Sequence, residues 1–98
     1  MRVVDFLTED KWTRCSMAKD SRGRSVSSES AEASRWCLAG AIDLCYTDIF
    51  ENANARIKIC KYIRELPDRF YQSETITWWN DQIADWPDVQ KMLEELQI

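Results

Sequence analysis

The side chains that could carry chemistry in this sequence are four cysteines and several carboxylates, because the chain contains no histidine. Without histidine it lacks the commonest general base near neutral pH and the usual nitrogen ligand of zinc. Cysteine–histidine and serine–histidine catalysis are therefore excluded within this chain. Asp81 and Asp85 could pair as carboxylates, but nothing in the sequence indicates the cleft or raised pKa that acid–base catalysis needs. The sequence predicts no catalytic residue and no enzyme activity.

The cysteines and glycines do not form a recognised metal, redox or phosphate site. Cys15, Cys37, Cys45 and Cys60 include no C-x-x-C pair, and three of them fall on apolar helical stripes. We expect reduced cysteines that act as small hydrophobic side chains, with Cys37 buried and its thiol pKa raised. The chain has only two glycines, so it lacks the glycine-rich phosphate loops of common nucleotide-binding enzymes. The sequence thus predicts no metal and no cofactor.

The charge is concentrated in the last third of the sequence. Between Phe70 and Ile98 six acidic residues stand against the single Lys91, which gives about five negative charges by direct count. The preceding residues are close to neutral. An acidic surface repels a phosphate backbone and suits a basic partner.

The segment Trp78-Trp79-Asn80-Asp81 has a structural and a functional interpretation. In the structural one, which we favour, one tryptophan fills the core beside Trp36. Asn80 or Asp81 then hydrogen-bonds nearby backbone and holds the turn into the last helix. In the functional one, the outward tryptophan and the surrounding acids form a binding patch.

The elements that must position these residues are mostly helical. We expect an α-rich α+β domain over residues 1–98, with a short helix at Arg2–Leu7 and a hairpin whose return strand is Ser25–Ser27. A buried helix should begin at Ser28 or Ser30 and carry Trp36 and Cys37. In it, Gly40 indicates close packing of another helix or, less favoured, of a ligand.

Two more main helices are expected in the second half of the sequence. The first should run from about Asn52 to Leu66, with a buried stripe at Ala53, Ile57, Cys60 and Ile63 that Ile59 and Leu66 widen. Pro67 should end this helix. The outer side of the helix should be basic. Thr75–Asp81 could be extended or one helical turn. Asp85 or Trp86 should cap the last helix, whose buried stripe is Val89, Met92, Leu93 and Leu96.

The sequence resembles a family of small phage, prophage and bacterial proteins of unknown function. The resemblance rests on Trp12, the Asp20–Gly23 turn, Trp36-Cys37, Gly40-Ala41 and Trp79-Asn80-Asp81, and so covers nearly the whole chain. This chain differs in having a shorter N-terminal helix. The resemblance implies a phage or mobile-element setting and brings no established activity with it. Because no run is long enough to span a membrane and no signal peptide is evident, we expect a protein of the host bacterial cytoplasm.

Our leading hypothesis is a phage-encoded accessory protein that binds a host protein and inhibits it by covering its surface. The host protein would have a basic surface, as in a nucleic-acid-binding defence effector of the CRISPR type, and neither nucleic acid nor membrane would be bound directly. The residues expected to bind it are aromatic anchors and acids of the last third: Glu74, Trp78, Asp85, Trp86, Asp88, Glu94 and Glu95.

Two alternatives remain open on the sequence. The chain could bind a small ligand or nucleotide in a pocket near Trp36, Gly40 and Trp79-Asn80-Asp81. It could also contact nucleic acid through the basic side of the helix expected at Asn52–Leu66, which is formed by Arg56, Lys58, Lys61 and Arg64. Because no aromatic residues are interleaved with these cations, we rank nucleic-acid contact last.

Overall fold

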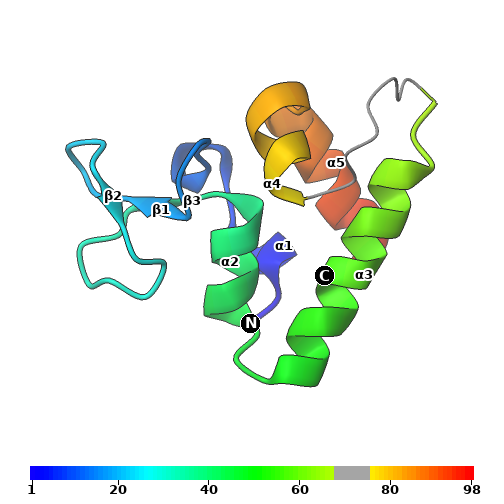
Figure 1. The fold of residues 1–98 in the computed structure, drawn as a ribbon, viewed down its shortest axis with the longest axis horizontal. Helices are drawn as coiled ribbons and strands as arrows, with labels where there is room; N and C mark the ends of the chain where they lie inside the picture. Colours follow the sequence, from blue (N-terminus) through cyan, green and yellow to red (C-terminus); the bar gives the residue numbers. More distant parts are fainter. Residues whose placement is uncertain (68–75) are drawn as a thin grey trace.

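The computed structural model describes residues 1–67 and 76–98, which form a mostly helical α+β fold (Figure 1). Short elements come first along the chain, and long helices follow. The N-terminal elements are α1 (Val3–Phe6), the 3-10 turn η1 (Glu9–Lys11), β1 (Ala18–Lys19), β2 (Ser25–Val26) and β3 (Arg35–Trp36). The remaining elements are α2 (Leu38–Cys45), α3 (Ile49–Arg64), α4 (Ile76–Trp78), the π-helix η2 (Trp79–Ile83) and α5 (Trp86–Leu96). The predicted fold class is confirmed.

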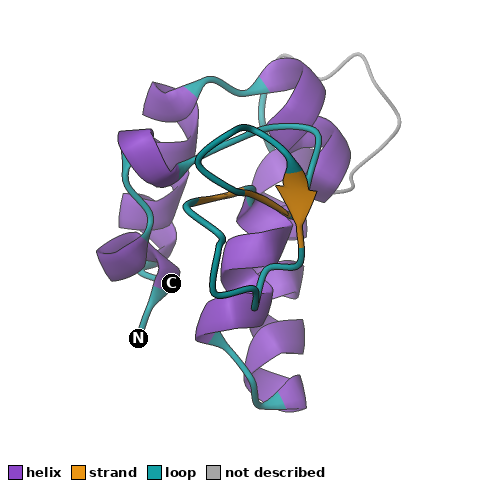
Figure 2. Cartoon of the chain, turned by 90° about the vertical axis from the view of Figure 1, so that its left-hand side faces the viewer, coloured by secondary structure: helices purple, strands orange, loops and turns teal. Residues whose placement is uncertain are grey.

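The predicted hairpin is present and has a third strand. β1 lies in the middle of the antiparallel order β2-β1-β3, with Ala18 opposite both Val26 and Trp36. The turn between β1 and β2 uses Gly23 at a φ of +80°, as its position in the turn predicts. Figures 1 and 2 show this small sheet at one side of the helices, with long loops between its strands.

Helix α2 begins about eight residues later than the sequence indicated. Trp36 is in a strand, because its backbone pairs with Ala18, and Cys37 caps the helix by accepting the Gly40 N–H on Sγ at 3.4 Å. Ser27 and Ser30 instead accept backbone N–H groups two residues ahead, in turns between β2 and β3. These serines therefore stabilise turns, which is the alternative use of residues that also cap helices.

Gly40 marks a close approach, but the neighbour is not another helix. A Cβ at this position would lie 2.0 Å from the backbone oxygen of Met17, just before β1. The same oxygen accepts the Cys37 N–H at 3.2 Å. Gly40 is thus required where the backbone just before the central strand β1 meets the first turn of α2.

Helix α3 is rotated relative to the predicted stripe. Asp48 caps it by accepting the N–H groups of Phe50 and Glu51, so it begins three residues earlier than expected. Ile59 and Ile63 are buried as predicted and Ala55 is buried in addition, whereas Ala53 and Ile57 are exposed. The sequence contains two apolar stripes at helical spacing, and periodicity alone does not show which one is buried.

From Ile76 onward, the observed elements agree closely with those predicted from the sequence. The segment from Ile76 to Ile83 is helical, as one of the two expected alternatives. Asp85 then caps α5 in a reciprocal capping box with Asp88, and Pro87 lies in the first turn. Val89, Met92 and Leu93 are buried as predicted, and Leu96 is half-buried.

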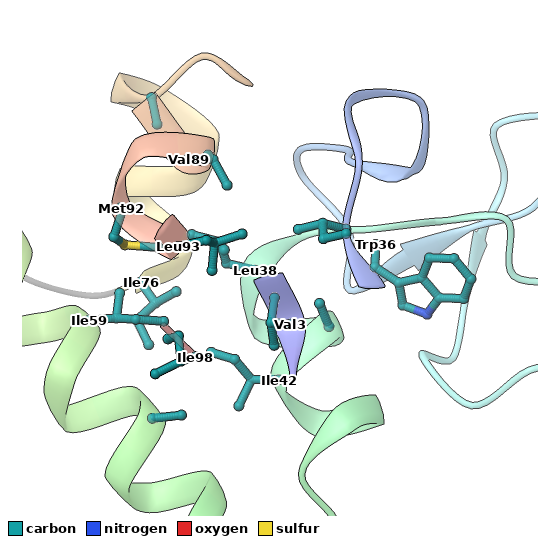
Figure 3. Close-up of a cluster of buried hydrophobic side chains, with 14 of the residues drawn as sticks. Val3, Trp36, Leu38, Ile42, Ile59, Ile76, Val89, Met92, Leu93 and Ile98 are labelled. Carbon is teal, nitrogen blue, oxygen red and sulfur yellow. The ribbon is translucent and has the colours of Figure 1, made fainter. Parts of the chain in front are cut away.

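One hydrophobic cluster joins the helices and extends toward the sheet (Figure 3). Val3 from α1 lies near Leu38 and Ile42 of α2, while Met92 and Leu93 approach from α5. Trp36 is in the same cluster and packs edge-on against Phe6, with ring centroids 4.9 Å apart. Across residues 1–67 and 76–98, no helix is long and apolar enough to cross a membrane.

Candidate functional site

Asn80 connects three segments that are distant in the sequence. Its side-chain oxygen accepts the Trp12 indole N–H at 2.7 Å and the Leu38 backbone N–H at 3.1 Å. Its side-chain nitrogen donates to the Thr13 carbonyl at 3.1 Å and to Asp81 at 2.8 Å. The side chain is fully buried and its hydrogen-bonding groups are used within the chain. Asn80 therefore holds the loop before β1 against the start of α2.

Asp81 and Arg14 reinforce the same junction. The Asp81 carboxylate accepts the backbone N–H of Cys15 at 2.8 Å, where Cys15 has a φ of +68°. The Arg14 guanidinium donates to the carbonyl oxygens of Asn80 and Ala84 and stacks 4.7 Å from the Trp12 ring. We expected Asn80 or Asp81 to bond nearby backbone and hold the turn into α5. Their partners outside the segment are instead 42 to 68 residues away.

The residues proposed for a small-ligand pocket are engaged in these internal contacts. Trp79 is buried, Asn80 is hydrogen-bonded as described, and Gly40 abuts the Met17 carbonyl. Trp36 donates its indole N–H to the Ser28 carbonyl at 2.9 Å. The structure thus gives each of these residues a role in packing or in holding loops together.

A surface groove lies between α1, η1 and one face of α5. Its volume is about 290 Å³, at the low end of the range for ligand pockets. Trp86 and Leu93 supply apolar surface from α5, and Glu9 and Glu94 supply acids from its two sides. The remaining lining residues are Val4, Leu7, Thr8 and Gln90. We call these eight residues the acidic groove.

Trp86 is held in place by side chains that do not line the acidic groove. Its ring lies 6.2 Å from that of Trp12, which is itself fixed by Asn80 and stacked by Arg14. Trp86 is half-buried and also lies in the first turn of a capped helix. Such a side chain loses little conformational freedom on binding, so it is a suitable anchor for a partner.

The structure brings together two of the predicted partner-binding residues, Trp86 and Glu94. Asp85 and Asp88 are exposed, but each accepts a hydrogen bond from the other's backbone N–H in the cap of α5. Trp78 is half-buried in α4 and does not line the acidic groove. Glu74 lies outside the described residues.

Glu95 points to a different groove, between α3 and α5. This groove has a volume of about 350 Å³ and is also lined by Lys58, Lys61, Tyr62, Glu65 and Leu96. Burial, followed by the charge and hydrogen bond of Glu95, raises the pKa of Tyr62. Of the predicted acids that the structure describes, Glu94 and Glu95 therefore line different grooves.

The basic residues of α3 are also divided. Arg56 is half-buried and forms an ion pair with Asp43 of α2 at 2.8 Å, while also donating to Asn52. Lys58 and Lys61 are exposed beside Glu65 and Glu95. Because acids are interspersed among these cations, they are poorly suited to a phosphate backbone.

The cysteines are unpaired, and Cys37 is buried as predicted, with burial raising the pKa of its thiol. Cys45 is half-buried and its pKa is also raised by burial. Within the part of the chain that the structure describes, no group of three or more cysteine, aspartate or glutamate side chains is placed to hold a metal ion.

The sequence identified only two of the eight residues of the acidic groove, Trp86 and Glu94. On α5 the residues Trp86, Gln90, Leu93 and Glu94 follow one helical face, which their spacing could have indicated. Glu9 and Leu7 come from the opposite end of the sequence, and no local signal predicts that α1 packs beside α5. Val3 contributes to that packing by donating its backbone N–H to the carbonyl of Ile98, two residues after the end of α5.

The comparisons with known proteins give one result. Neither the curated proteins nor the solved structures include a significant match to this chain. Residues 1–96, which include the first ten residues and every motif discussed above, match the model of a protein family described only as a family of unknown function (DUF6197). The chain therefore belongs to that family.

Proposed function

We propose that this chain is a binding protein whose acidic groove receives a basic segment of a partner protein. The observation that carries the proposal is that Trp86, Glu9 and Glu94 line the same groove. An arginine or lysine side chain placed there would meet an aromatic face and two carboxylates. Both are favourable contacts for a cation, and more so once water is displaced.

The contacts that fix Trp86 support this role. Trp86 neighbours Trp12, and Asn80 and Arg14 fix Trp12. A preorganised aromatic anchor with an acidic rim is typical of the residues that dominate affinity in protein interfaces. The groove is too small to enclose most cofactors but has room for one or two protein side chains.

We further propose that the partner is a bacterial host protein which this chain inhibits by covering a basic surface. The resemblance to phage and prophage proteins supports the host setting. A nucleic-acid-binding defence effector, such as one of the CRISPR type, has the required basic groove. In this proposal the chain acts in the host cytoplasm, without a cofactor, and has no catalytic role.

The test combines crosslinking in cells with matched charge reversals. A photoreactive amino acid at Gln90, which is exposed in the acidic groove, should capture the partner in a bacterial host. Glu9→Lys with Glu94→Lys should abolish this capture. Glu29→Lys with Glu32→Lys makes the same change in net charge on exposed acids of the loop between β2 and β3, and should preserve capture.

Mass spectrometry of the crosslinked product then identifies the residue of the partner that enters the groove. A lysine- or arginine-rich segment supports the proposal. Capture that survives reversal of Glu9 and Glu94, or a crosslink to an acidic or apolar segment, contradicts it. A partner captured through a basic segment but still active when saturated with this chain contradicts the inhibitory part alone.

A further inference from the structure

Helix α3 carries a second apolar stripe that faces away from the core. Ile49, Phe50 and Ile57 are 70%, 77% and 64% exposed, which is unusual for side chains of this size clustered on one helix. Ala53 is exposed on the same stripe, and Cys60 lies at its margin, half-buried and also packed against the core. We call these five residues the α3 outer face. In Figure 1, α3 forms one edge of the molecule, so no described helix covers its outer side.

The distribution of charge along α3 limits what can cover this face. Asp48 and Glu51 make the N-terminal end negative, and Lys58 and Lys61 make the C-terminal half positive. A second copy of α3 running antiparallel would bring each negative end beside a positive end. The opposed helix dipoles would add to this attraction. A uniformly acidic or basic partner would meet repulsion at one end of the helix.

The side chains on the α3 outer face also complement themselves in the antiparallel orientation. A two-fold axis level with the midpoint between Asn54 and Ala55 places Ile49 beside Cys60 of the other copy. The same axis brings Ile57 of one copy over the small Ala53 of the other. Small residues opposite large ones permit close approach of two helices. Both halves of a two-fold interface are thus present on one helix face.

We infer that two copies of this chain associate through antiparallel contact of the α3 outer face. The face shares no residue with the acidic groove, which therefore stays open in the dimer. Because one helix from each copy forms the contact, the interface falls among small ones, below about 1,200 Å² in total. We expect a weak dimer whose population rises with protein concentration.

Sedimentation equilibrium over protein concentrations from about 1 µM to about 500 µM tests the association by mass action. Phe50→Glu and Ile57→Glu should each weaken it about tenfold or more, because each places a charge in the apolar centre of the contact. Ile83→Glu, at an exposed apolar residue of η2, should leave it unchanged. Circular dichroism of each variant monitors folding.

A disulfide tests the orientation. In Ile49→Cys, mild oxidation should join residue 49 of one copy to the native Cys60 of the other, as identified by peptide mass spectrometry. The two positions are about 16 Å apart along a single helix, so the bond cannot form within one chain. Glu32→Cys, an exposed control outside α3, should give no link to Cys60.

Each outcome decides between the possibilities. Concentration-dependent dimers that are lost in the Phe50 and Ile57 variants, together with the 49–60 link, support the inference. A protein that stays monomeric throughout the concentration range overturns it, as does a dimer insensitive to both glutamates. Links that join Cys60 only to Cys60 overturn the antiparallel arrangement.

Discussion

The indole N–H of Trp12 donates a 2.7 Å hydrogen bond to the side-chain oxygen of Asn80, 68 residues further along the chain. The same oxygen accepts the Leu38 N–H. Trp12, Trp36-Cys37, Gly40 and Trp79-Asn80-Asp81 thus meet around the junction between the sheet, α2 and η2. The resemblance noted in the sequence rests on these residues, and their contacts hold distant segments of the fold together.

Replacing Asn80 should destabilise the whole protein. Asn80→Ala removes the partner of the buried Leu38 N–H and of the partly buried Trp12 N–H and Thr13 carbonyl. Each such loss costs about 1–3 kcal/mol, so we expect the free energy of unfolding to fall by roughly 3 kcal/mol or more. Urea denaturation measures it, with Gln82→Ala on the exposed side of η2 as control. A loss as small as that of the control would contradict the role of Asn80.

Alanine at Gly40 should be destabilising in spite of its higher helix propensity. The propensity gain of about 1 kcal/mol is outweighed because the new Cβ would overlap the Met17 carbonyl oxygen. Gly23→Ala is the comparison: its surroundings are open, and only the positive φ costs energy, about 1–2 kcal/mol. Denaturation should therefore show a larger loss for Gly40→Ala than for Gly23→Ala, and the reverse order would be inconsistent with this packing.

Asp20 should contribute to a loss of stability in acid. The backbone N–H of Arg24, and then its side chain and the Arg22 N–H, lower the pKa of this carboxyl below its ordinary value of 3.8. A lowered pKa stabilises the folded state above the ordinary value and ceases to do so as pH falls through the folded-state value.

The effect of Asp20 can be measured from unfolding curves recorded between about pH 5 and about pH 2.5. Asp20→Asn should make the decline in unfolding free energy shallower over this range, because it removes a group that binds a proton more readily when unfolded. Glu32→Gln, on an exposed loop, serves as control. An unchanged slope in Asp20→Asn would show that the turn does not hold the ionised carboxylate.

The cysteines should differ in their reaction with iodoacetamide. Cys15 is exposed and should be modified first, whereas Cys37 is buried and has a raised thiol pKa, so it should be modified last. Mass spectrometry of peptides at successive times gives the order. All four should react readily in urea, which controls for intrinsic reactivity. Equal rates at Cys15 and Cys37 in the native protein would contradict the buried position of Cys37.

The elements that the sequence predicted well are those specified by neighbouring residues. Asp85, Pro87 and Asp88 define the start of α5, and its apolar spacing defines the buried side. Helix α2 was placed too early because the strand pairing of Trp36 with Ala18 joins positions that no local pattern links. Ala53 and Ile57 of α3 were wrongly predicted to be buried, because two apolar faces compete and only tertiary packing selects one of them.

The candidate site was predictable to a similar extent. Trp86 and Glu94 were identified from the acidic and aromatic composition of the last third of the sequence. Glu9 was not, since its place in the acidic groove depends on packing of the N-terminal helix beside α5. Glu95 has similar sequence surroundings to Glu94 but lies on the other side of α5, since adjacent helical residues point in different directions.

The late position of Asn80 also bears on the order in which the protein can fold as it is synthesised. Translation delivers Trp12, the strands and α2 well before the residue that secures them. Until Asn80 leaves the ribosome, the indole N–H of Trp12 and the N–H of Leu38 have only water as a partner. Contacts over such sequence separations form slowly, and incompletely folded chains expose apolar surface. The nascent N-terminal segment therefore lacks these two hydrogen bonds until most of the chain has been synthesised.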